Sequence, residues 1–378
     1  ENQQQHLGHI TSISRIAPDR YMWLDRFTVR NLELVHSPND NAVTLSQVLD
    51  KTKTPMGGRL LKRWLVLPLK DRKPIEERHQ VVAALKEEHT IHSELDARLS
   101  EIGDLERLIS KVAVGKINPR EVQHLRRTLQ QIKPIHHLLG SISNQSLKAL
   151  LDNLDACQDL IELIEKNLCA EPALQIGKGP VIKDGRDTLL DELRAISTNG
   201  KDFLEQIQER ESLATGISSL KIAFNNVFGY YIEVRNTHKD KVPDSWIRKQ
   251  TLVSAERYIT EELKEYEQKI LGAEEKILKI EQQIYQELLY AMADFIGPIQ
   301  KNAQYIAQLD CLFSFAKVAH AQNYCLPTLS DGFELDIKDG RHPVIEQRLP
   351  IGDSYVANDI FLDNGSQQIM MITGPNMS

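Results

Sequence analysis

Residues 259–295 read ITEELKEYEQKILGAEEKILKIEQQIYQELLYAMADF. A near-heptad stripe like this one predicts one long helix packed along a single partner helix. We expect the helix to end at Gly297-Pro298 and to span roughly 60 Å, too long for the core of a compact domain. The apolar residues recur at steps of four and three with charged faces between them, and they are Ile259, Leu263, Tyr266, Ile270, Ala273, Ile277, Ile280, Ile284, Leu288, Ala291 and Phe295.

A second amphipathic stretch upstream supplies the partner helix. Between the two helices, residues 220–224 and 230–234 alternate as strands do, and Asn225-Asn226 with Gly229 supplies turn chemistry. After a loop around Pro243 the chain is expected to return to helix. The sequence therefore predicts two antiparallel helical arms that carry a small β-rich tip. The residues that mark the outward helix, which runs to about Ser212, are Leu189, Leu190, Leu193, Ile196, Phe203, Leu204 and Ile207.

Positive charge gathers at this tip, although the whole chain of 378 residues has a net charge of −7. Residues 216–253 hold six basic and three acidic side chains, a balance of +3, which leaves −10 for the rest of the chain. The following stretch, 254–296, holds five basic and ten acidic residues, a balance of −5. A basic island on an acidic protein predicts a docking surface for nucleic acid, with a solvated loop face as the alternative.

Most of the chain before these arms has a helical pattern. Residues 1–45 are expected to form short strands and turns, and the helical pattern runs from Thr44 to about residue 168. Thr54-Pro55 and Asn118-Pro119 each combine an N-cap residue with proline at the first helical position. Hydrophobic residues make up 41% and charged residues 26%, as in ordinary soluble proteins. The sequence contains no run of about 18 apolar residues, so it predicts no membrane span.

Cysteine spacing and the N-terminus bear on the compartment. The chain opens ENQQQ, without an initiator Met or a signal-peptide core, as we expect of a chain that starts inside a longer protein. No pair of cysteines has CxxC spacing, which argues against a zinc site and against a disulfide scaffold. We therefore expect a cytoplasmic protein with no metal site. The four cysteines are Cys157, Cys169, Cys311 and Cys325.

From Pro327 onward the pattern changes to turns and short strands, at 333–337, 344–345 and 369–372. The last is a continuous apolar run, Ile369-Met370-Met371-Ile372, of the kind that parallel sheets bury on both faces. It leads into residues 374–378, which would fill the first five positions of the phosphate-binding loop G-x-x-x-x-G-K-[ST]. The alternative is an ordinary Gly-Pro turn after a buried strand.

The chemistry of such a loop depends on residues that come later in it. Backbone N–H groups surround the phosphate oxygens, the lysine neutralises their charge and the hydroxyl holds Mg²⁺. The second glycine, the lysine and the hydroxyl are absent from this chain. We therefore expect this chain to bind ATP weakly or not at all and not to hydrolyse it, and we assign it no catalytic residue.

Seven blocks of the sequence, in order, resemble the MutS family of DNA mismatch-repair proteins. The resemblance covers essentially the whole chain, and the last block resembles the family's particular phosphate-binding loop. The blocks are NLEL (31–34), TPMGGRLLKRWL (54–65), FNNVFGYYI (224–232), ERYI (256–259), LKEYE (263–267), GRHPVIE (340–346) and TGPNMS (373–378).

The resemblance implies a mainly α, multidomain fold in four segments. A core or lever domain would occupy 1–199 and return at 261–326, a DNA clamp 200–260, and the start of an α/β ABC-type ATPase domain 327–378. In the family, two protomers embrace DNA through their clamps, a wedge domain senses the mismatch, and ATP exchange produces a sliding clamp that recruits MutL. The wedge and connector domains are expected before residue 1, so the chain is expected to be a fragment, cut inside the ATP-binding loop, that does not discriminate mismatches.

The resemblance also implies site residues, to which charge adds others. ATP or ADP with Mg²⁺ is the cofactor of the parent protein, and none is expected bound to this fragment. For adenine stacking the matching position is Tyr355, and for the phosphates the matching residues are Gly374, Pro375, Asn376, Met377 and Ser378. The clamp positions that match phosphate contacts are Asn225, Arg248, Lys249 and Ser254, of which the first three are expected to converge on one DNA backbone. Charge alone adds Lys221, Arg235, Lys239 and Lys241.

These residues predict a DNA mismatch-repair protein whose partners are double-stranded DNA, a second protomer and MutL, located in the cytoplasm at the nucleoid, with no membrane contact. The parent would be a DNA-dependent ATPase. Two other classes remain as alternatives. One is a coiled-coil arm of another ABC-type DNA-maintenance ATPase, in which the phosphate loop would precede much longer arms. The other is a helical scaffold with no ligand, against which the basic tip and the Gly374 loop speak.

Overall fold

The computed structural model describes residues 18–39, 41–225, 229–350 and 352–373, without the side chains of 199–202. Two compact units make up the described chain: one from the described residues of 1–117, 124–161 and 293–378, the other from those of 118–123 and 162–292. We call them the head unit and the arm unit. Ahead of the arms the chain forms η1 (Pro18–Arg20), α1 (Arg26–Asn31), α2 (Leu45–Leu49), α3 (Pro55–Val66), α4 (Arg72–Glu87), η2 (His89–Ile91), α5 (His92–Ser100), α6 (Leu105–Ala113), α7 (Pro119–Gln130), α8 (Ile132–Gly140), α9 (Gln145–Leu151) and α10 (Gln158–Asn167).

The head unit is built around α13 (Ile296–Ala321), which is preceded by η4 (Ala293–Phe295). Apolar side chains are buried on all sides of α13, among them Ile299, Leu309 and Phe313, because α3, α4 and α6 pack around it. A helix that is apolar all round is stable only when neighbours cover it all round. The sequence after α13 forms β5 (Leu335–Gly340), α14 (Pro343–Glu346) and β6 (Asn358–Leu362), and β5 pairs with β6 antiparallel.

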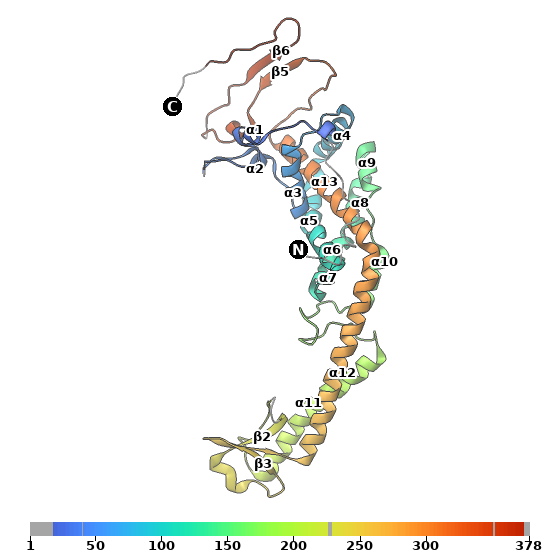
Figure 1. Ribbon diagram of the computed structural model, residues 1–378, viewed down its shortest axis with the longest axis vertical. Coiled ribbons are helices and arrows are strands. Elements are labelled where there is room, and N and C mark those ends of the chain that lie inside the picture. Colours follow the sequence, from blue (N-terminus) through green and yellow to red (C-terminus); the bar gives the residue numbers. More distant parts are fainter. Residues whose placement is uncertain (1–17, 40, 226–228, 351, 374–378) are drawn as a thin grey trace, which may run out of the picture. The chain divides into compact units, whose positions relative to one another are not determined.

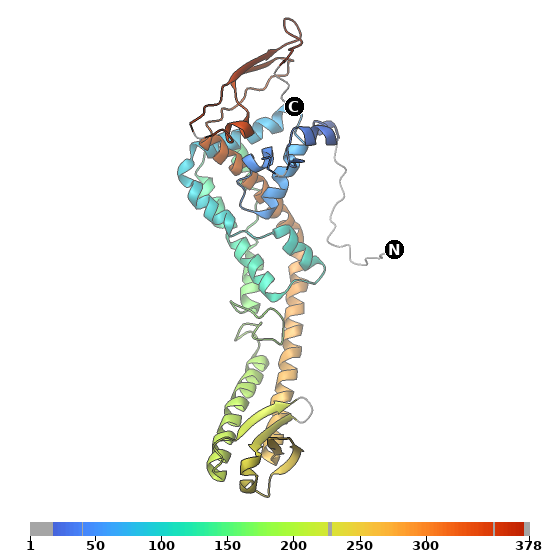
Figure 2. The ribbon, with the colours of Figure 1, turned by 90° about the vertical axis from the view of Figure 1, so that its left-hand side faces the viewer.

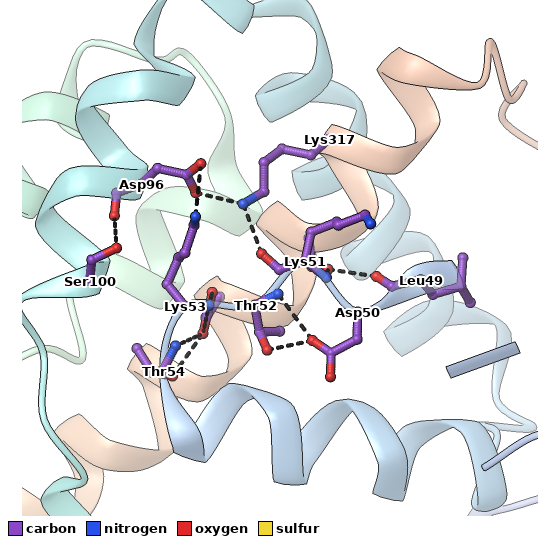
Figure 3. Close-up of polar contacts among 11 residues, drawn as sticks. Leu49, Asp50, Lys51, Thr52, Lys53, Thr54, Asp96, Ser100 and Lys317 are labelled. Atoms are coloured by element: carbon purple, nitrogen blue, oxygen red, sulfur yellow. Dashed lines mark hydrogen bonds and ion pairs between the residues drawn. The ribbon is translucent and has the colours of Figure 1, made fainter. Parts of the chain in front are cut away.

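A buried aspartate joins α13 to the start of α3. The Asp310 carboxylate accepts hydrogen bonds from the Thr54 backbone N–H and hydroxyl, both at 2.7 Å, and from the Lys53 N–H at 3.0 Å. The Thr54 hydroxyl in turn accepts from the Gly57 N–H at 2.9 Å as the N-cap of α3. Burial raises the pKa of Asp310. Figure 3 shows the loop before α3 and, beside it, Lys53 and Lys317 reaching the same carboxylate of Asp96.

The main elements of the arm unit are α11 (Thr188–Thr215), α12 (Glu261–Met292) and the sheet between them. Both views show α11 and α12 side by side (Figures 1 and 2). They run antiparallel, because partners later in α11 meet partners earlier in α12: Arg194 with Glu281, Phe203 with Tyr266 and Arg210 with Glu262. Gly216 ends α11 in the left-handed conformation at φ 67°, which glycine adopts without steric cost.

The tip is a four-stranded antiparallel sheet in the order β1-β2-β4-β3. Its elements are β1 (Lys221–Asn225), β2 (Gly229–Arg235), η3 (Asn236–Lys241), β3 (Ile247–Thr251) and β4 (Ala255–Ile259). One face packs on the ends of both arms, where Ile232, Val234 and Tyr258 meet Leu204 and Leu263 in a single apolar cluster. Figure 1 labels β2 and β3 of this sheet beside the ends of α11 and α12.

Several expected elements are confirmed with small shifts. The paired arms and the hairpin β1–β2 form as expected, and Asn118 caps α7 with its side chain by accepting from the Glu121 N–H at 3.0 Å. The return helix begins at Glu261 instead of Ile259, which lies in β4. It gives way to a 3-10 turn after Met292, and Gly297-Pro298 lies in the first turn of α13.

Other expectations are wrong. Described residues before 45 form short helices and turns in place of strands, because Asp25 caps α1 and Thr44 caps α2; residues 1–17 of the expected segment lie outside the described residues. Val344 and Ile345 lie in α14, whose N-terminus the His342 ring caps, and not in a strand. Residues 369–372 form no strand, and Ile369 is 86% exposed. An apolar run becomes a buried strand only where neighbouring strands and helices cover it, and none of the described elements does.

The hairpin β3–β4 was not expected, since the chain was predicted to return directly to helix after Pro243. Its signal is the alternation across Ala255, Arg257 and Ile259, which point to one face while Glu256 and Tyr258 point to the other. The stripe of the return helix concealed this alternation because Ile259 has the right spacing for both patterns.

Candidate nucleic-acid interface

The face of the tip sheet opposite the apolar cluster carries polar and charged side chains in register. Residues that lie directly opposite each other in an antiparallel ladder share a face. Lys221 is opposite Glu233, Glu233 is opposite Arg257, and Arg257 is opposite Gln250, so one polar row crosses all four strands. Alternation places Arg235 on the same outer face. One row of the outer face is therefore polar from edge to edge.

Arg257 organises this row, and sequence reasoning did not select it. Its Nε lies 3.2 Å from Glu233 Oε2, and its NH1 donates to Gln250 Oε1 at 2.9 Å. The guanidinium also stacks on Tyr231, 4.3 Å from the ring centroid. Because Glu233 is neutralised within the sheet, it does not offset the charge of the surrounding lysines.

Five basic side chains at the tip have no acidic partner. Among the described residues, no carboxylate oxygen lies within 4 Å of their side-chain nitrogens, and all five are exposed. They belong to β1, the end of β2, η3 and the irregular point of β3 where its register with β4 shifts. All were predicted as DNA contacts, and they are Lys221, Arg235, Lys239, Lys241 and Lys249.

Arg248 differs from these five because it has an acidic partner. Its NH1 lies 3.4 Å from Glu256 Oε1, and the Glu256 side chain is only 12% exposed. The Tyr258 hydroxyl donates to the other oxygen of the same carboxylate, and burial raises the pKa of Tyr258 to about 12. The Arg248 side chain is nevertheless 62% exposed to solvent. Arg248 therefore neutralises the buried Glu256 carboxylate, and much of its side chain remains exposed to solvent.

The expected convergence of Asn225, Arg248 and Lys249 on one DNA backbone stays a prediction, and the structure separates Asn225 from the other two residues across the sheet. Asn225 lies in β1 and Arg248 in β3, the two opposite edge strands of the sheet. Three strand spacings separate them, about 14 Å. Ser254 lies in the turn between β3 and β4, where its carbonyl accepts from the Asn236 N–H at 3.1 Å. Any DNA contacts by these residues would therefore reach different phosphates.

The predicted nucleotide residues are only partly within the described chain. Tyr355 is half-buried and lies in the segment before β6. Gly374, Pro375, Asn376, Met377 and Ser378 lie outside the described residues. Within the described residues, no group of three or more His, Cys, Asp or Glu side chains is placed to hold a metal ion.

The fold and the tip together define a mainly α, multidomain protein whose paired helical arms carry a small basic sheet. A family model described as MutS domain III matches residues 27–316. The chain is 59% identical over 378 residues to the DNA mismatch repair protein MutS of Flavobacterium johnsoniae, covering 100% of this chain and 44% of that protein. The chain belongs to the MutS family.

Other relatives carry the same printed name. The DNA mismatch repair protein MutS of Bacteroides fragilis is 57% identical over 372 residues, which are 98% of this chain and 43% of that protein. Its counterpart from Cytophaga hutchinsonii is 53% identical over 378 residues, 100% of this chain and 44% of that protein. The chain thus spans less than half the length of these relatives. Within the described ranges, no helix has both the length and the apolar character needed to cross a membrane.

Proposed function

We propose that this chain supplies the helical lever and the DNA-backbone clamp of a DNA mismatch-repair protein. The lever corresponds to the helical segments 1–199 and 261–326, and the clamp to 200–260. Relatives across several bacteria carry the name DNA mismatch repair protein MutS, and the match extends over the whole of this chain. The observation that carries the proposal is the set of exposed, unpartnered cations at the tip of an otherwise acidic protein.

The chemistry of the tip favours DNA phosphates as its ligand. Exposed lysines and arginines that lack acidic partners bind the phosphate backbone by displacing counterions, a binding mode that depends little on sequence. The cations are spread over two edges and one end of the sheet. We expect each to contact a different phosphate along the duplex. Affinity should then be weak, with a Kd of about 10⁻⁴ to 10⁻⁶ M.

The test measures how binding depends on salt. A labelled duplex is titrated with the unsubstituted chain and with the variant Lys239→Ala/Lys241→Ala. Binding is followed by fluorescence anisotropy between about 50 and 200 mM salt. These lysines lie in η3, where no strand pairing depends on their side chains. We expect the slope of log K against log salt to fall by roughly two units, since each lost phosphate contact removes about one.

A matched control removes the same charge elsewhere in the arm unit. Lys276 and Lys279 are exposed on α12 and belong to none of the four strands. The variant Lys276→Ala/Lys279→Ala should show the same slope of log K against log salt as the unsubstituted chain. If both double variants lower the slope equally, DNA responds only to total charge and the tip is not the clamp.

A second candidate role for these cations is protection of the sheet edges. Charged residues on edge strands prevent pairing with other chains, and Lys221 and Lys249 lie on the two edge strands. Lys239 and Lys241 lie in η3, off both edges. Edge protection therefore predicts no change in DNA binding for Lys239→Ala/Lys241→Ala.

We further propose that recognition of the mismatch resides in parts of the parent protein beyond this chain. Phosphate contacts carry no base information. Matched and mismatched duplexes should therefore compete equally for binding to the unsubstituted chain. A preference for the mismatched duplex would show that this chain itself reads bases.

For the parent protein we propose ATP or ADP with Mg²⁺ at residues 374–378 and Tyr355, a second protomer and MutL as partners, and a location at the nucleoid. These proposals rest on the family resemblance of the blocks at 340–346 and 373–378.

A further inference from the structure

A cleft in the head unit carries positive charge that has no partner among the described residues. It has a volume of about 830 Å³ and lies among α3, α4, α6 and α13. The polar side chains that matter for its chemistry are Arg63 of α3, Arg78 of α4, and Gln304 and Gln308 of α13. Its volume falls in the range of pockets that bind ligands of moderate size.

Arg78 is the most unusual of these residues. Its guanidinium carbon lies 3.5 Å from the centroid of the Trp64 ring, so the two planar groups are in contact. Burial lowers the pKa of Arg78, as expected for a cation that has lost water without gaining a counterion. Among the described residues, no hydrogen-bond acceptor or carboxylate engages this guanidinium. Its donor edge remains available to a ligand in the cleft.

Arg63 adds a second unpaired cation, whereas Arg59 does not add a third. The guanidinium of Arg59 donates to Asp104 at 2.7 Å and to Glu106 at 2.6 Å, so its charge is already neutralised. The exposed Arg63 has no carboxylate partner among the described residues. Two guanidinium groups, one per wall, therefore face the same cleft. Guanidinium groups bind carboxylates through two parallel hydrogen bonds.

The glutamines indicate what kind of acid fits. Gln304 and Gln308 are one helical turn apart on α13, a rise of about 6.0 Å. An extended peptide advances about 6.6 Å every two residues. Side-chain amides at this spacing match alternate backbone amides of an extended chain, both as donors and as acceptors. Leu60, Leu67 and Ile109 add apolar lining.

We propose that this cleft binds an acidic peptide segment in an extended conformation. The carboxylates pair with Arg63 and Arg78, and the peptide backbone pairs with Gln304 and Gln308. Apolar side chains at the intervening positions contact Leu60 and Leu67. The chain's own residues 1–17 do not provide such a segment, since they contain a single acidic residue and a single basic one.

The test uses the whole chain and a defined probe. A fluorescein-labelled peptide of alternating aspartate and leucine is titrated with the parent, Arg63→Ala, Arg78→Gln and Arg127→Ala. Arg127 is exposed on α7 outside the cleft and serves as the matched control. We expect the Kd to rise about tenfold or more for each cleft variant, because each loses a charge-assisted hydrogen bond. The control should bind as the parent does.

Competitors separate the chemical classes. The same peptide with asparagine in place of aspartate should not displace the probe. Sodium tripolyphosphate and duplex DNA should displace it less well than unlabelled acidic peptide. Equal Kd values for all four proteins, equal competition by the asparagine peptide, or stronger competition by either phosphate compound would overturn the proposal. Arg63 is exposed, so Arg63→Ala decides the outcome even if Arg78→Gln fails to fold.

Discussion

Two adjacent glycines in the first turn of α3 differ in the space around them. A Cβ at Gly57 would lie 2.3 Å from Asp310 Oδ2, whereas a Cβ at Gly58 would meet nothing closer than Thr52 Oγ1 at 3.4 Å. We predict that Gly57→Ala lowers the free energy of unfolding by roughly 1–3 kcal/mol, because the methyl group displaces the buried carboxylate from its donors. Urea unfolding followed by circular dichroism measures this change.

Gly58→Ala is the control for that substitution, since it adds the same methyl group one residue further along the helix. It should leave stability unchanged or raise it by up to about 1 kcal/mol through helix propensity. Equal effects at the two positions would mean that Asp310 does not restrict the start of α3.

A second prediction at this scale concerns pH. Hydrogen bonds from Arg59 hold the pKa of Asp104 below its usual value of 3.8. A carboxyl group with a depressed folded pKa contributes stability above its unfolded pKa, and this contribution is lost as pH falls through the folded value. We expect Arg59→Gln to lower the urea midpoint at pH 7 and to have a progressively smaller effect as pH falls below 3.8. Lys62 is exposed on the same helix, so Lys62→Gln should leave the urea midpoint unchanged both at pH 7 and at acidic pH.

At the scale of elements, the two arms are joined by ion pairs that differ in burial. Arg194 lies 2.7 Å from Glu281, whose side chain is 3% exposed, and its other nitrogen lies 2.6 Å from Asp184. We predict that Arg194→Ala destabilises the arm unit by about 3–5 kcal/mol, because it leaves a buried carboxylate without a partner. Thermal unfolding of the parent and the variant would measure the loss.

Arg210 supplies the comparison, because it bridges the same two helices at the surface. It lies 2.6 Å from Glu262, whose side chain is 40% exposed. Arg210→Ala should cost no more than about 1 kcal/mol. A larger loss for Arg210→Ala than for Arg194→Ala would contradict the assignment of the buried pair as the stronger link.

The elements that local pattern determines could be predicted from the sequence. Thr54-Pro55 and Asn118-Pro119 mark true helix starts because caps act within four residues of chain. The stripe at 259–295 required a partner helix, and α11 provides it. The hairpin β3–β4 was missed because the spacing of Ile259 satisfied the helical stripe as well as the strand.

At the scale of the whole molecule, the prediction was limited by strand order. The sequence shows which residues are basic, but it does not show which residues lie opposite each other on neighbouring strands. The strand order places Asn225 and Arg248 on opposite edges and brings Arg257 beside Glu233. The pairing of Arg248 with the buried Glu256 likewise depends on a register that no local pattern encodes.

The apolar run at 369–372 gives a whole-molecule prediction. Ile369, Met371 and Ile372 are each about 85% exposed, and no described strand pairs with them. We expect their amides to exchange with solvent much faster than those of α13, whose backbone is hydrogen-bonded and buried. Hydrogen-exchange mass spectrometry makes the comparison within one sample. Strong protection at 369–372 would mean that a partner covers this run.

Lysine acetylation in the presence and absence of duplex tests whether the tip of the arm unit binds DNA phosphates, as we propose. We expect duplex to protect Lys221, Lys239, Lys241 and Lys249 from acetylation, while Lys276 and Lys279 on α12 react at the same rate with and without it. Protection should disappear at high salt, since it depends on phosphate contacts. Unchanged acetylation of the four tip lysines, or equal protection of the two α12 lysines, would show that the tip does not bind DNA phosphates.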